Sequence, residues 1–384
     1  MPTVLRLPRV FILAAVLASP LAAADKPIDL MKNGDFTGGA APWDGLGTDA
    51  DHDASIATVD GHPVLRLKRI TKGANVTVTQ YNLGFKPQTW YRLSATGWGT
   101  GPGALSLRLQ SKKDPEFDKV VRSWATSSCP MPNSATEPMS ESLVIDSGLV
   151  PESAYLNLRL DGEEPGEYAF RSLSLIELGS SKPDPKHLVL AHLGDSITIT
   201  SYLPFSKRVD ALLAPMLAKA FPKRDIRQMN LATDGESIAE LFDTKRYEKV
   251  IKSNYQKIDI AVIRYGANDS RAFPPAEFKK KVVLLCEALE KDYPGIRIVL
   301  GTGPWVKDSA DINKQYGGHW QVLRDVAAER KYPLAEITKR FEQEASSATG
   351  RSPSDMHPSP LGVTLVADAE FAVLKPLLEA MPEK

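Results

Sequence analysis

The pattern of apolar and polar positions changes near residue 185. Between Ile28 and Leu178, short runs of alternating or β-branched residues are separated by Gly, Pro, Asn and Asp, without a convincing long helical pattern. Alternation with a period of two is typical of strands that bury one face, so this half predicts an all-β sandwich. The clearest runs are 64–67, 76–79, 91–94, 105–109, 155–160 and 173–176.

Beyond Lys186, apolar runs of strand length alternate with helical patterns. This alternation predicts a parallel sheet with helices on both faces. The predicted fold class is therefore α/β, a three-layer α/β/α domain with a parallel sheet, preceded by an all-β sandwich domain. Strands are predicted at 188–193, 226–231, 258–264, 296–301 and 333–337, and helices at 205–220, 237–252, 275–291, 312–329 and 360–379.

Two other segments divide the chain. Arg6 and Arg9 precede a short apolar run, and Ala22 to Ala24 supply small residues, which predicts a cleaved secretory signal peptide. The apolar run is too short to span a bilayer, so we expect no membrane insertion and a secreted or periplasmic protein. Ser180 to Pro185 is polar and contains prolines, which predicts a linker between separable domains. The predicted division is a signal peptide at 1–24, a β-sandwich at 25–179, a linker at 180–186 and an α/β domain at 187–384.

Composition narrows the possible partners. The 47 basic and 47 acidic residues cancel, so nothing favours nucleic acid or an anionic membrane. The two cysteines, Cys129 and Cys286, fall in different predicted domains, and Cys286 lies in an apolar helical pattern typical of a core position. His and Cys do not cluster with the spacing of metal ligands. We therefore expect neither a disulfide framework nor a metal or organic cofactor.

The first strand of the α/β half ends abruptly in Gly194-Asp195-Ser196. A serine at the carboxyl end of a buried strand stands at the sheet edge where open α/β folds bind ligands, so Ser196 is a candidate nucleophile. Gly-Asp-Ser is also typical of turns, so a structural role stays open at this point. The motif is not the Gly-x-Ser-x-Gly elbow, because residue 198 is threonine.

Three later stretches contain the residue types that an acyl-transfer serine needs: 230–235 with Gly235, Gly266-Ala267-Asn268-Asp269, and Asp355-Met356-His357-Pro358. Together with Gly-Asp-Ser, these blocks resemble, in order, those of the SGNH (GDSL-type) hydrolase family. The resemblance covers the chain from about Lys186 onward.

This resemblance implies a role for each residue. Ser196 would be the nucleophile and His357 its general base, because imidazole titrates near neutral pH. The backbone N–H groups of Ser196 and Gly235 and the side chain of Asn268 would form the oxyanion hole.

One position departs from the family pattern. The family usually has aspartate three residues before the histidine, where this chain has Ser354, whereas Asp355 is two residues before it. We expect Asp355 to orient His357 through a shifted loop. The alternative is a Ser-His dyad in which a backbone carbonyl orients the imidazole.

The β-rich half also resembles a known type of domain. The stretch 30–36 followed by Trp43, and the stretch 168–175, resemble galactose-binding-like jelly-roll modules, a fold that many carbohydrate-binding modules share. Such modules often hold calcium through a late aspartate, but Phe170 and Arg171 stand at that place, which argues against calcium. Four tryptophans could either stack on sugars or pack in the core, namely Trp43, Trp90, Trp98 and Trp124.

An SGNH domain after a jelly roll resembles bimodular carbohydrate esterases. The resemblance implies a secreted serine esterase that removes acetyl groups from a polysaccharide or acetylated sugar through an acyl-serine intermediate. The alternatives are a lipase-like or thioesterase-like enzyme, an O-acetyltransferase acting on an exopolysaccharide, and a non-catalytic sugar-binding protein.

Overall fold

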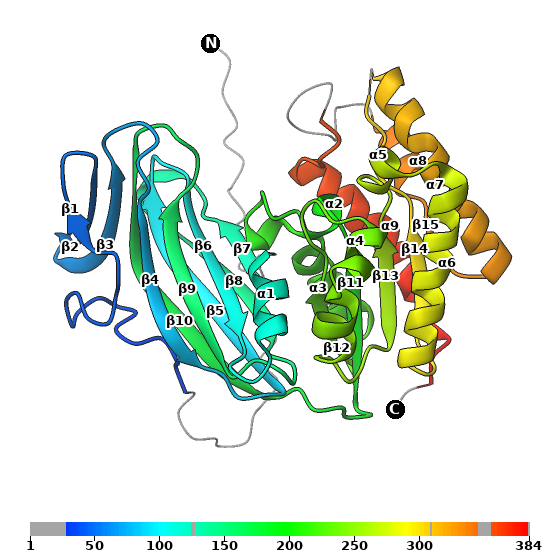
Figure 1. Cartoon of the computed structure of the whole chain (residues 1–384), viewed down its shortest axis with the longest axis horizontal. Helices are drawn as coiled ribbons and strands as arrows, with labels where there is room; N and C mark the ends of the chain where they lie inside the picture. Colours follow the sequence, from blue (N-terminus) through cyan, green and yellow to red (C-terminus); the bar gives the residue numbers. More distant parts are fainter. Residues whose placement is uncertain (1–27, 124–126, 308, 345–354, 383–384) are drawn as a thin grey trace, which may run out of the picture.

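The computed structural model describes residues 28–123, 127–307, 309–344 and 355–382. The predicted signal peptide at 1–24 therefore lies outside the described residues, as do Trp124 and Ser354. Figure 1 shows a β-rich part, in blue to green, beside a part in which strands and helices alternate, in green to red.

The β-rich part consists of two antiparallel sheets that share one core. The six-stranded sheet has the order β1-β2-β3-β10-β5-β8 and the four-stranded sheet the order β4-β9-β6-β7. Alternate residues point inward, for example Leu156 and Leu158 of one strand and Leu105 and Leu107 of its neighbour, and all four are buried in the same cluster. The strands are β1 Gly47–Thr48, β2 His52–Val59, β3 His62–Arg69, β4 Thr77–Gly84, β5 Thr89–Gly99, β6 Gly103–Gln110, β7 Ser127–Pro130, β8 Ser134–Asp146, β9 Ser153–Leu160 and β10 Gly166–Ser180.

One helix in this part escaped prediction. Helix α1, Pro115–Ser123, follows β6 and begins where the Asp114 carboxylate accepts hydrogen bonds from the Glu116 and Phe117 amides, both at 3.1 Å. Phe117 is buried in the sandwich core. The apolar pattern of α1 is too short for its periodicity to distinguish a helix from a strand.

The second part is built on a five-stranded parallel sheet with the order β12-β11-β13-β14-β15. Its strands are β11 His187–Gly194, β12 Asp225–Asn230, β13 Ile260–Arg264, β14 Arg297–Gly301 and β15 Leu334–Ala335. Its helices are α2 Ser196–Ile199, α3 Val209–Ala220, α4 Ile238–Asp243, α5 Asp269–Ala272, α6 Pro275–Asp292, α7 Ala310–Arg330, α8 Ile337–Glu342 and α9 Pro360–Glu379, with a 3-10 turn η1 at Phe205–Lys207 and a π-helical turn η2 at Tyr247–Lys252.

The central strand β11 shows how the layers form. Val189, Ala191 and Leu193 pack with residues of α4, α6 and α7, whereas Leu188 and Leu190 pack with residues of α3, α8 and α9. Both faces of the sheet are therefore covered by helices, which confirms the predicted parallel α/β arrangement. A strand buried on both faces has no polar side, which is why its sequence is a continuous apolar run.

Three predicted elements differ from the structure. The predicted helix at 205–220 divides into η1 and α3, because Arg208 between them has an extended backbone. The predicted helix at 237–252 divides into α4 and η2. Ile337, predicted as the end of a strand, begins α8 instead. It is buried, and a buried apolar residue is equally typical of a strand end and of a helix start, so its apolar character did not distinguish them.

Two tryptophans that could have stacked on sugars are core residues. Trp43 is 6% exposed and Trp90 5% exposed, so neither presents a ring face to solvent. Trp98 is half-buried. Cys129 and Cys286 are buried free thiols.

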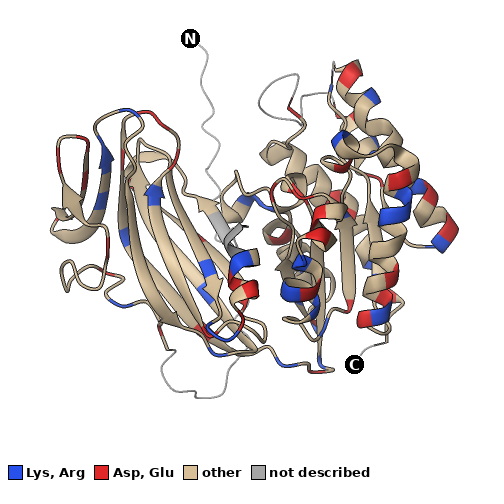
Figure 2. Ribbon diagram, in the orientation of Figure 1, with Lys and Arg blue, Asp and Glu red and all other residues tan. Residues whose placement is uncertain are grey.

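Two observations bear on contact with membranes and charged partners. Among the described residues, no helix combines the length and apolarity that crossing a membrane requires. In the ribbon of Figure 2, acidic and basic positions are interspersed along the outer helices.

A buried ionic cluster joins α9 to the sheet. Glu370 of α9 is fully buried, and its carboxylate lies 3.0 Å from Arg264 Nε of β13 and 3.6 Å from His192 Nδ1 of β11. His192 stands in the same strand row as Leu188 and Leu190, facing α9. Removing one partner of such a cluster leaves buried charge without compensation.

We therefore expect Glu370→Ala to lower the free energy of unfolding by about 3–5 kcal/mol, because Arg264 would be left buried without its partner. Chemical denaturation measures the change. The matched control is Glu379→Ala on the same helix, which breaks an exposed pair with Lys375 and should cost at most about 1 kcal/mol. Equal effects of the two substitutions would show that the buried cluster does not hold α9.

Candidate active site

Three strand ends meet at one edge of the parallel sheet. The chain leaves β11 for β12 on one side and then returns to β13 on the other, so the strand order reverses at β11. Such a reversal opens a crevice at the carboxyl ends of the strands, where open α/β folds bind ligands. Ser196 follows β11, Gly235 follows β12 and Asn268 follows β13. The topology thus gathers three of the predicted site residues on this edge.

Ser196 is turned outward by the close packing of Gly194. A Cβ atom at Gly194 would lie 2.4 Å from the Arg264 carbonyl oxygen and 2.2 Å from Thr198 Oγ1, so only glycine fits there. The chain then turns into α2, where the Asp195 carboxylate caps the helix by accepting a hydrogen bond from the Ile197 amide at 3.1 Å. Ser196 is the first residue of that helix and is partly exposed.

The His357 side chain bridges Ser196 and Asp355. His357 Nε2 lies 2.9 Å from Ser196 Oγ, and His357 Nδ1 lies 2.6 Å from Asp355 Oδ1. The histidine comes from the segment just before α9, whose first turn is capped by Ser359. Residues 161 positions apart in the sequence therefore form one hydrogen-bonded chain.

The position of Asp355, two residues before the histidine, is accommodated by a tight turn. Asp355 Oδ1 accepts a hydrogen bond from the His357 backbone amide at 3.0 Å as well as facing the imidazole. This turn folds the carboxylate back onto the histidine that follows it. A carboxylate therefore reaches the imidazole even though the family's usual aspartate position is a serine here, Ser354.

The two other predicted oxyanion donors lie on adjacent loops. Gly235 has a φ of +77°, a left-handed conformation that favours glycine. Within the described residues, no acceptor is found for its amide. Asn268 Nδ2 donates to the Glu236 carbonyl oxygen at 3.2 Å, which holds the Asn268 amide group next to Gly235.

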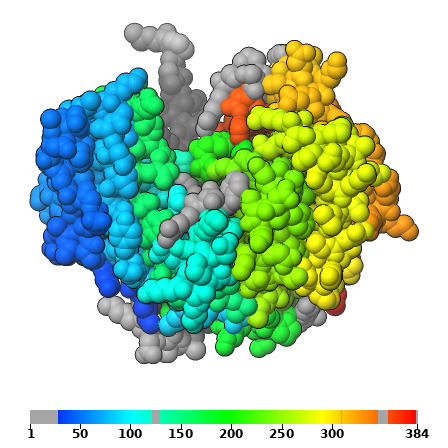
Figure 3. Space-filling view, in the orientation of Figure 1, coloured from blue at the N-terminus to red at the C-terminus, as the bar shows by residue number. Residues whose placement is uncertain are grey.

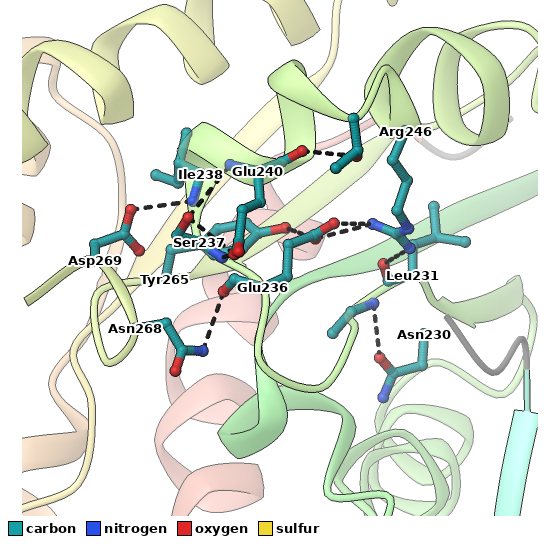
Figure 4. A network of polar contacts seen from close by, with 12 residues as sticks. Asn230, Leu231, Glu236, Ser237, Ile238, Glu240, Arg246, Tyr265, Asn268 and Asp269 are labelled. Carbon is teal, nitrogen blue, oxygen red and sulfur yellow. Dashed lines mark hydrogen bonds and ion pairs between the residues drawn. The ribbon is translucent and has the colours of Figure 1, made fainter. Parts of the chain in front are cut away.

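A buried polar network supports this pair of loops, and sequence reasoning missed it (Figure 4). Glu236 is fully buried, 3.0 Å from Arg246 Nη1, and accepts a hydrogen bond from the Tyr265 hydroxyl at 2.6 Å. Arg246 also donates to the Leu231 carbonyl at 2.6 Å. Burial raises the pKa of Glu236, whereas Arg246 opposes that rise. The network fixes the backbone on either side of Gly235.

Helix α4 begins immediately after this point. Ser237 and Glu240 form a capping box, with the Ser237 amide donating to Glu240 at 2.8 Å and the Glu240 amide to Ser237 Oγ at 3.2 Å. The Ile238 amide donates to the Asp269 carboxylate at 3.0 Å, which ties the helix start to the Asn268 loop.

Tyr202 is a further neighbour that the sequence did not indicate. Its ring lies edge-on to the His357 imidazole, with centroids 5.2 Å apart, and its hydroxyl donates to the Pro358 carbonyl at 2.9 Å. Both contacts restrain the segment that carries His357. Aromatic residues are common in loops, so no signal in the sequence separated Tyr202 from the others.

The arrangement can move a proton from Ser196 Oγ to His357 Nε2 while Asp355 faces the opposite ring nitrogen. It offers amide groups to an oxyanion at the same edge of the sheet. Among the described residues, no group of three or more His, Cys, Asp or Glu side chains could hold a metal ion.

The two motif aspartates are buried beneath the site. Burial raises the pKa of Asp195 to about 7, with neighbouring Asp269 contributing, and burial raises the pKa of Asp269 to about 6. An unfolded aspartate titrates near pH ~4. The native state therefore retains these protons at pH values where the unfolded chain has lost them, and stability falls as pH rises from about 4 to about 7.

Asp195→Asn should reduce this pH dependence, because asparagine cannot ionise but can still accept the capping hydrogen bond. Urea denaturation at pH 4 and pH 8 measures it. The free energy of unfolding of the variant, relative to that of wild type, should be roughly 2–4 kcal/mol higher at pH 8 than at pH 4. The size follows from about 1.4 kcal/mol for each pH unit of pKa elevation. The exposed Asp368→Asn is the control. A constant difference at both pH values would contradict the elevated pKa.

One family model matches the part of the chain that contains the site. The family model described as GDSL-like Lipase/Acylhydrolase family matches residues 192–365. No curated protein sequence matches the chain.

Several solved structures show a partial likeness to this chain. A family two carbohydrate esterase from Clostridium thermocellum, in complex with cellohexaose, is 17% identical, with 82% of this chain and 95% of that one covered and a TM-score of 0.42. An acetylxylan esterase from Geobacillus stearothermophilus is 18% identical, with coverages of 50% and 96% and a TM-score of 0.41. A putative GDSL-like lipase from Parabacteroides merdae is 18% identical, with coverages of 49% and 95% and a TM-score of 0.42. At these identities and TM-scores the likenesses say nothing of substrate.

The family match spans the end of β11, all three loops at the sheet edge and the start of α9, so it includes every residue of the site described above. The α/β part of this chain is a GDSL/SGNH hydrolase domain.

Proposed function

We propose that the protein is a secreted serine esterase that removes acetyl groups from carbohydrates through an acyl-serine intermediate. The observation that carries the proposal is the hydrogen-bonded chain Ser196–His357–Asp355, with 2.9 Å between Ser196 Oγ and His357 Nε2 and 2.6 Å between His357 Nδ1 and Asp355 Oδ1. A serine hydroxyl is a weak nucleophile at neutral pH, and a base at hydrogen-bond distance is what activates it.

The reaction proceeds by double displacement. Ser196 Oγ attacks the ester carbonyl as its proton passes to His357 Nε2, and the negative charge collects on the carbonyl oxygen. The amides of Ser196 and Gly235 and the Asn268 side chain donate to that oxygen. The tetrahedral intermediate collapses, and the alcohol leaves with the proton from His357.

The second half releases the acid. Water gives a proton to His357 Nε2 and attacks the acyl carbon, and the new tetrahedral intermediate expels Ser196 Oγ, which takes the proton back. Asp355 stabilises the imidazolium that forms twice in each cycle and keeps the ring in the required tautomer.

The substrate class is supported by the organisation of the chain. An SGNH domain preceded by a β-sandwich resembles bimodular carbohydrate esterases, and the N-terminal segment resembles a secretory signal peptide. Polysaccharides carrying O-acetyl groups are large, hydrated and extracellular, which fits an exported enzyme. Acetate release from a panel of acetylated glycans, measured beside a long-chain ester, tests the substrate class. Hydrolysis of the long-chain ester alone would contradict it.

Ser196→Ala should lower kcat on a chromogenic acetate ester by roughly four to six orders of magnitude, because the nucleophilic oxygen is lost. Circular dichroism should show an unchanged fold, since Ser196 is partly exposed at a helix start. A variant that keeps more than about a tenth of wild-type turnover would rule out Ser196 as the nucleophile.

Asp355→Asn distinguishes a triad from a dyad. If the carboxylate orients His357, kcat should fall by about three to four orders of magnitude, because an amide favours the wrong tautomer. The matched control, Asp368→Asn on the exposed side of α9, should leave kcat unchanged. A loss of about tenfold or less in Asp355→Asn, the size of an indirect effect, would indicate a dyad.

A further inference from the structure

The loop between α2 and α3, residues 200–208, touches both sides of the candidate site. Tyr202 contacts the His357 ring and donates to the Pro358 carbonyl. Ser201 Oγ donates to the Asp234 carboxylate at 2.5 Å, next to Gly235. We call residues 200–208 the anchor loop. Its first half thus restrains the histidine segment and one of the loops that would hold the oxyanion.

The second half of the anchor loop is fixed in the β-sandwich. Phe205 is 2% exposed and belongs to the buried core of the sandwich, in the same cluster as Cys129 and Met131. The η1 turn, which begins at Phe205, packs against β8. A side chain from the hydrolase domain is therefore a core residue of the other part of the chain.

A buried carboxylate of the sandwich binds the next residue. Glu141 of β8 is 5% exposed, and its two oxygens accept hydrogen bonds from the Ser206 amide and the Ser206 hydroxyl, both at 2.9 Å. A carboxylate fixed by two donors on one residue sets both the position and the direction of the backbone there.

Arg208 makes the anchor loop rigid. Its guanidinium lies 4.5 Å from the centroid of the Phe205 ring, and it donates to the Leu203 carbonyl at 3.0 Å and to the Ser201 carbonyl at 3.1 Å. These contacts link the half that enters the sandwich to the half that meets His357. A displacement of Phe205 would therefore be transmitted to Tyr202.

A second group of contacts joins the two parts away from the anchor loop. Asn254 accepts from the Val150 amide at 2.8 Å through its side chain and from the Leu149 amide at 2.9 Å through its backbone, and Lys249 lies 3.0 Å from Asp114. In Figure 3 the cyan segment of the sandwich is pressed against the green segment of the hydrolase domain. The two parts meet as one packed body.

We propose that the β-sandwich is a structural part of the active site: through Phe205 and Glu141 it fixes the anchor loop, and through Tyr202 it fixes the orientation of His357. This inference rests on the proposed esterase activity. On this inference the two parts are not the separable domains that the sequence predicts, because the hydrolase domain alone would expose Phe205 and leave Ser206 without Glu141. Phe205, Glu141 and Tyr202 are positioning residues.

The test compares Phe205→Ala with Phe205→Leu and with Lys249→Ala. Phe205→Ala removes the side chain that enters the sandwich core, Phe205→Leu keeps most of its volume, and Lys249→Ala breaks an interface contact remote from the anchor loop. Glu141→Ala is the second variant, which leaves the Phe205 side chain in place and serves where Phe205→Ala fails to fold.

Steady-state kinetics on a soluble acetate ester give the first readout. We expect Phe205→Ala to lower kcat by about 10- to 100-fold with little change in KM, because misplacing a reacting group by about 1 Å costs on that scale. Glu141→Ala should lower kcat by about tenfold, as loss of an outer positioning contact does. Phe205→Leu should recover most of the activity, and Lys249→Ala should match wild type.

Hydrogen exchange gives a readout that needs no activity. In Phe205→Ala and Glu141→Ala, peptides covering 200–208 and 355–360 should exchange faster than in wild type, whereas peptides of β13 and α6 should be unchanged. The inference is overturned if folded variants keep kcat within about twofold of wild type, or if exchange in these two peptides does not change. Failure of wild type to hydrolyse any ester would instead count against the proposed function, and the exchange result would still decide the anchoring.

Discussion

The close packing at Gly194 is the constraint on which the site depends. Strand β11 is buried along its whole length between helices, and a side chain at Gly194 would overlap the Arg264 carbonyl and Thr198. Only glycine fits at the point where the chain leaves the sheet. The next two residues, Asp195 and Ser196, cap and begin the short helix α2. A partly exposed hydroxyl at the end of a fully buried strand follows directly. Because β12 and β13 run parallel to β11 on either side of it, their carboxyl ends lie at the same edge.

Buried polar groups hold the pieces around that edge. Glu236, Arg246 and Tyr265 fix the loop that bears Gly235, while Glu370, Arg264 and His192 fix α9, which follows His357. Each group is costly to bury alone and is stabilised by its partners. Loss of one member would leave the others buried without a partner. The β-sandwich adds a third support through the anchor loop.

The sequence predicted features that depend on local pattern. Helix 360–379 appeared with its observed ends because Ser359 and Pro360 mark its start, and the buried strand before Ser196 appeared because both its faces are apolar. His357 and Asp355 were identified by their resemblance to a family motif, although Asp355 does not have the family's usual spacing from the histidine. Features set by contacts between distant residues were missed. Glu236 and Tyr265 are separated by 29 positions, and Phe205 carries no mark that its core lies in the other half of the chain. The jelly-roll identity of the sandwich stays a prediction.

The proposed reaction requires that an acyl group pass through Ser196. The most direct measurement is rapid acid quenching of the enzyme during turnover of an activated acetate ester, followed by mass spectrometry of the proteolytic peptides. We expect one acetyl group on the peptide containing Ser196, formed before acetate release reaches steady state and absent without ester. Acetyl on another residue, or steady product release with no acyl-enzyme even when deacylation is slowed at low pH, would contradict it.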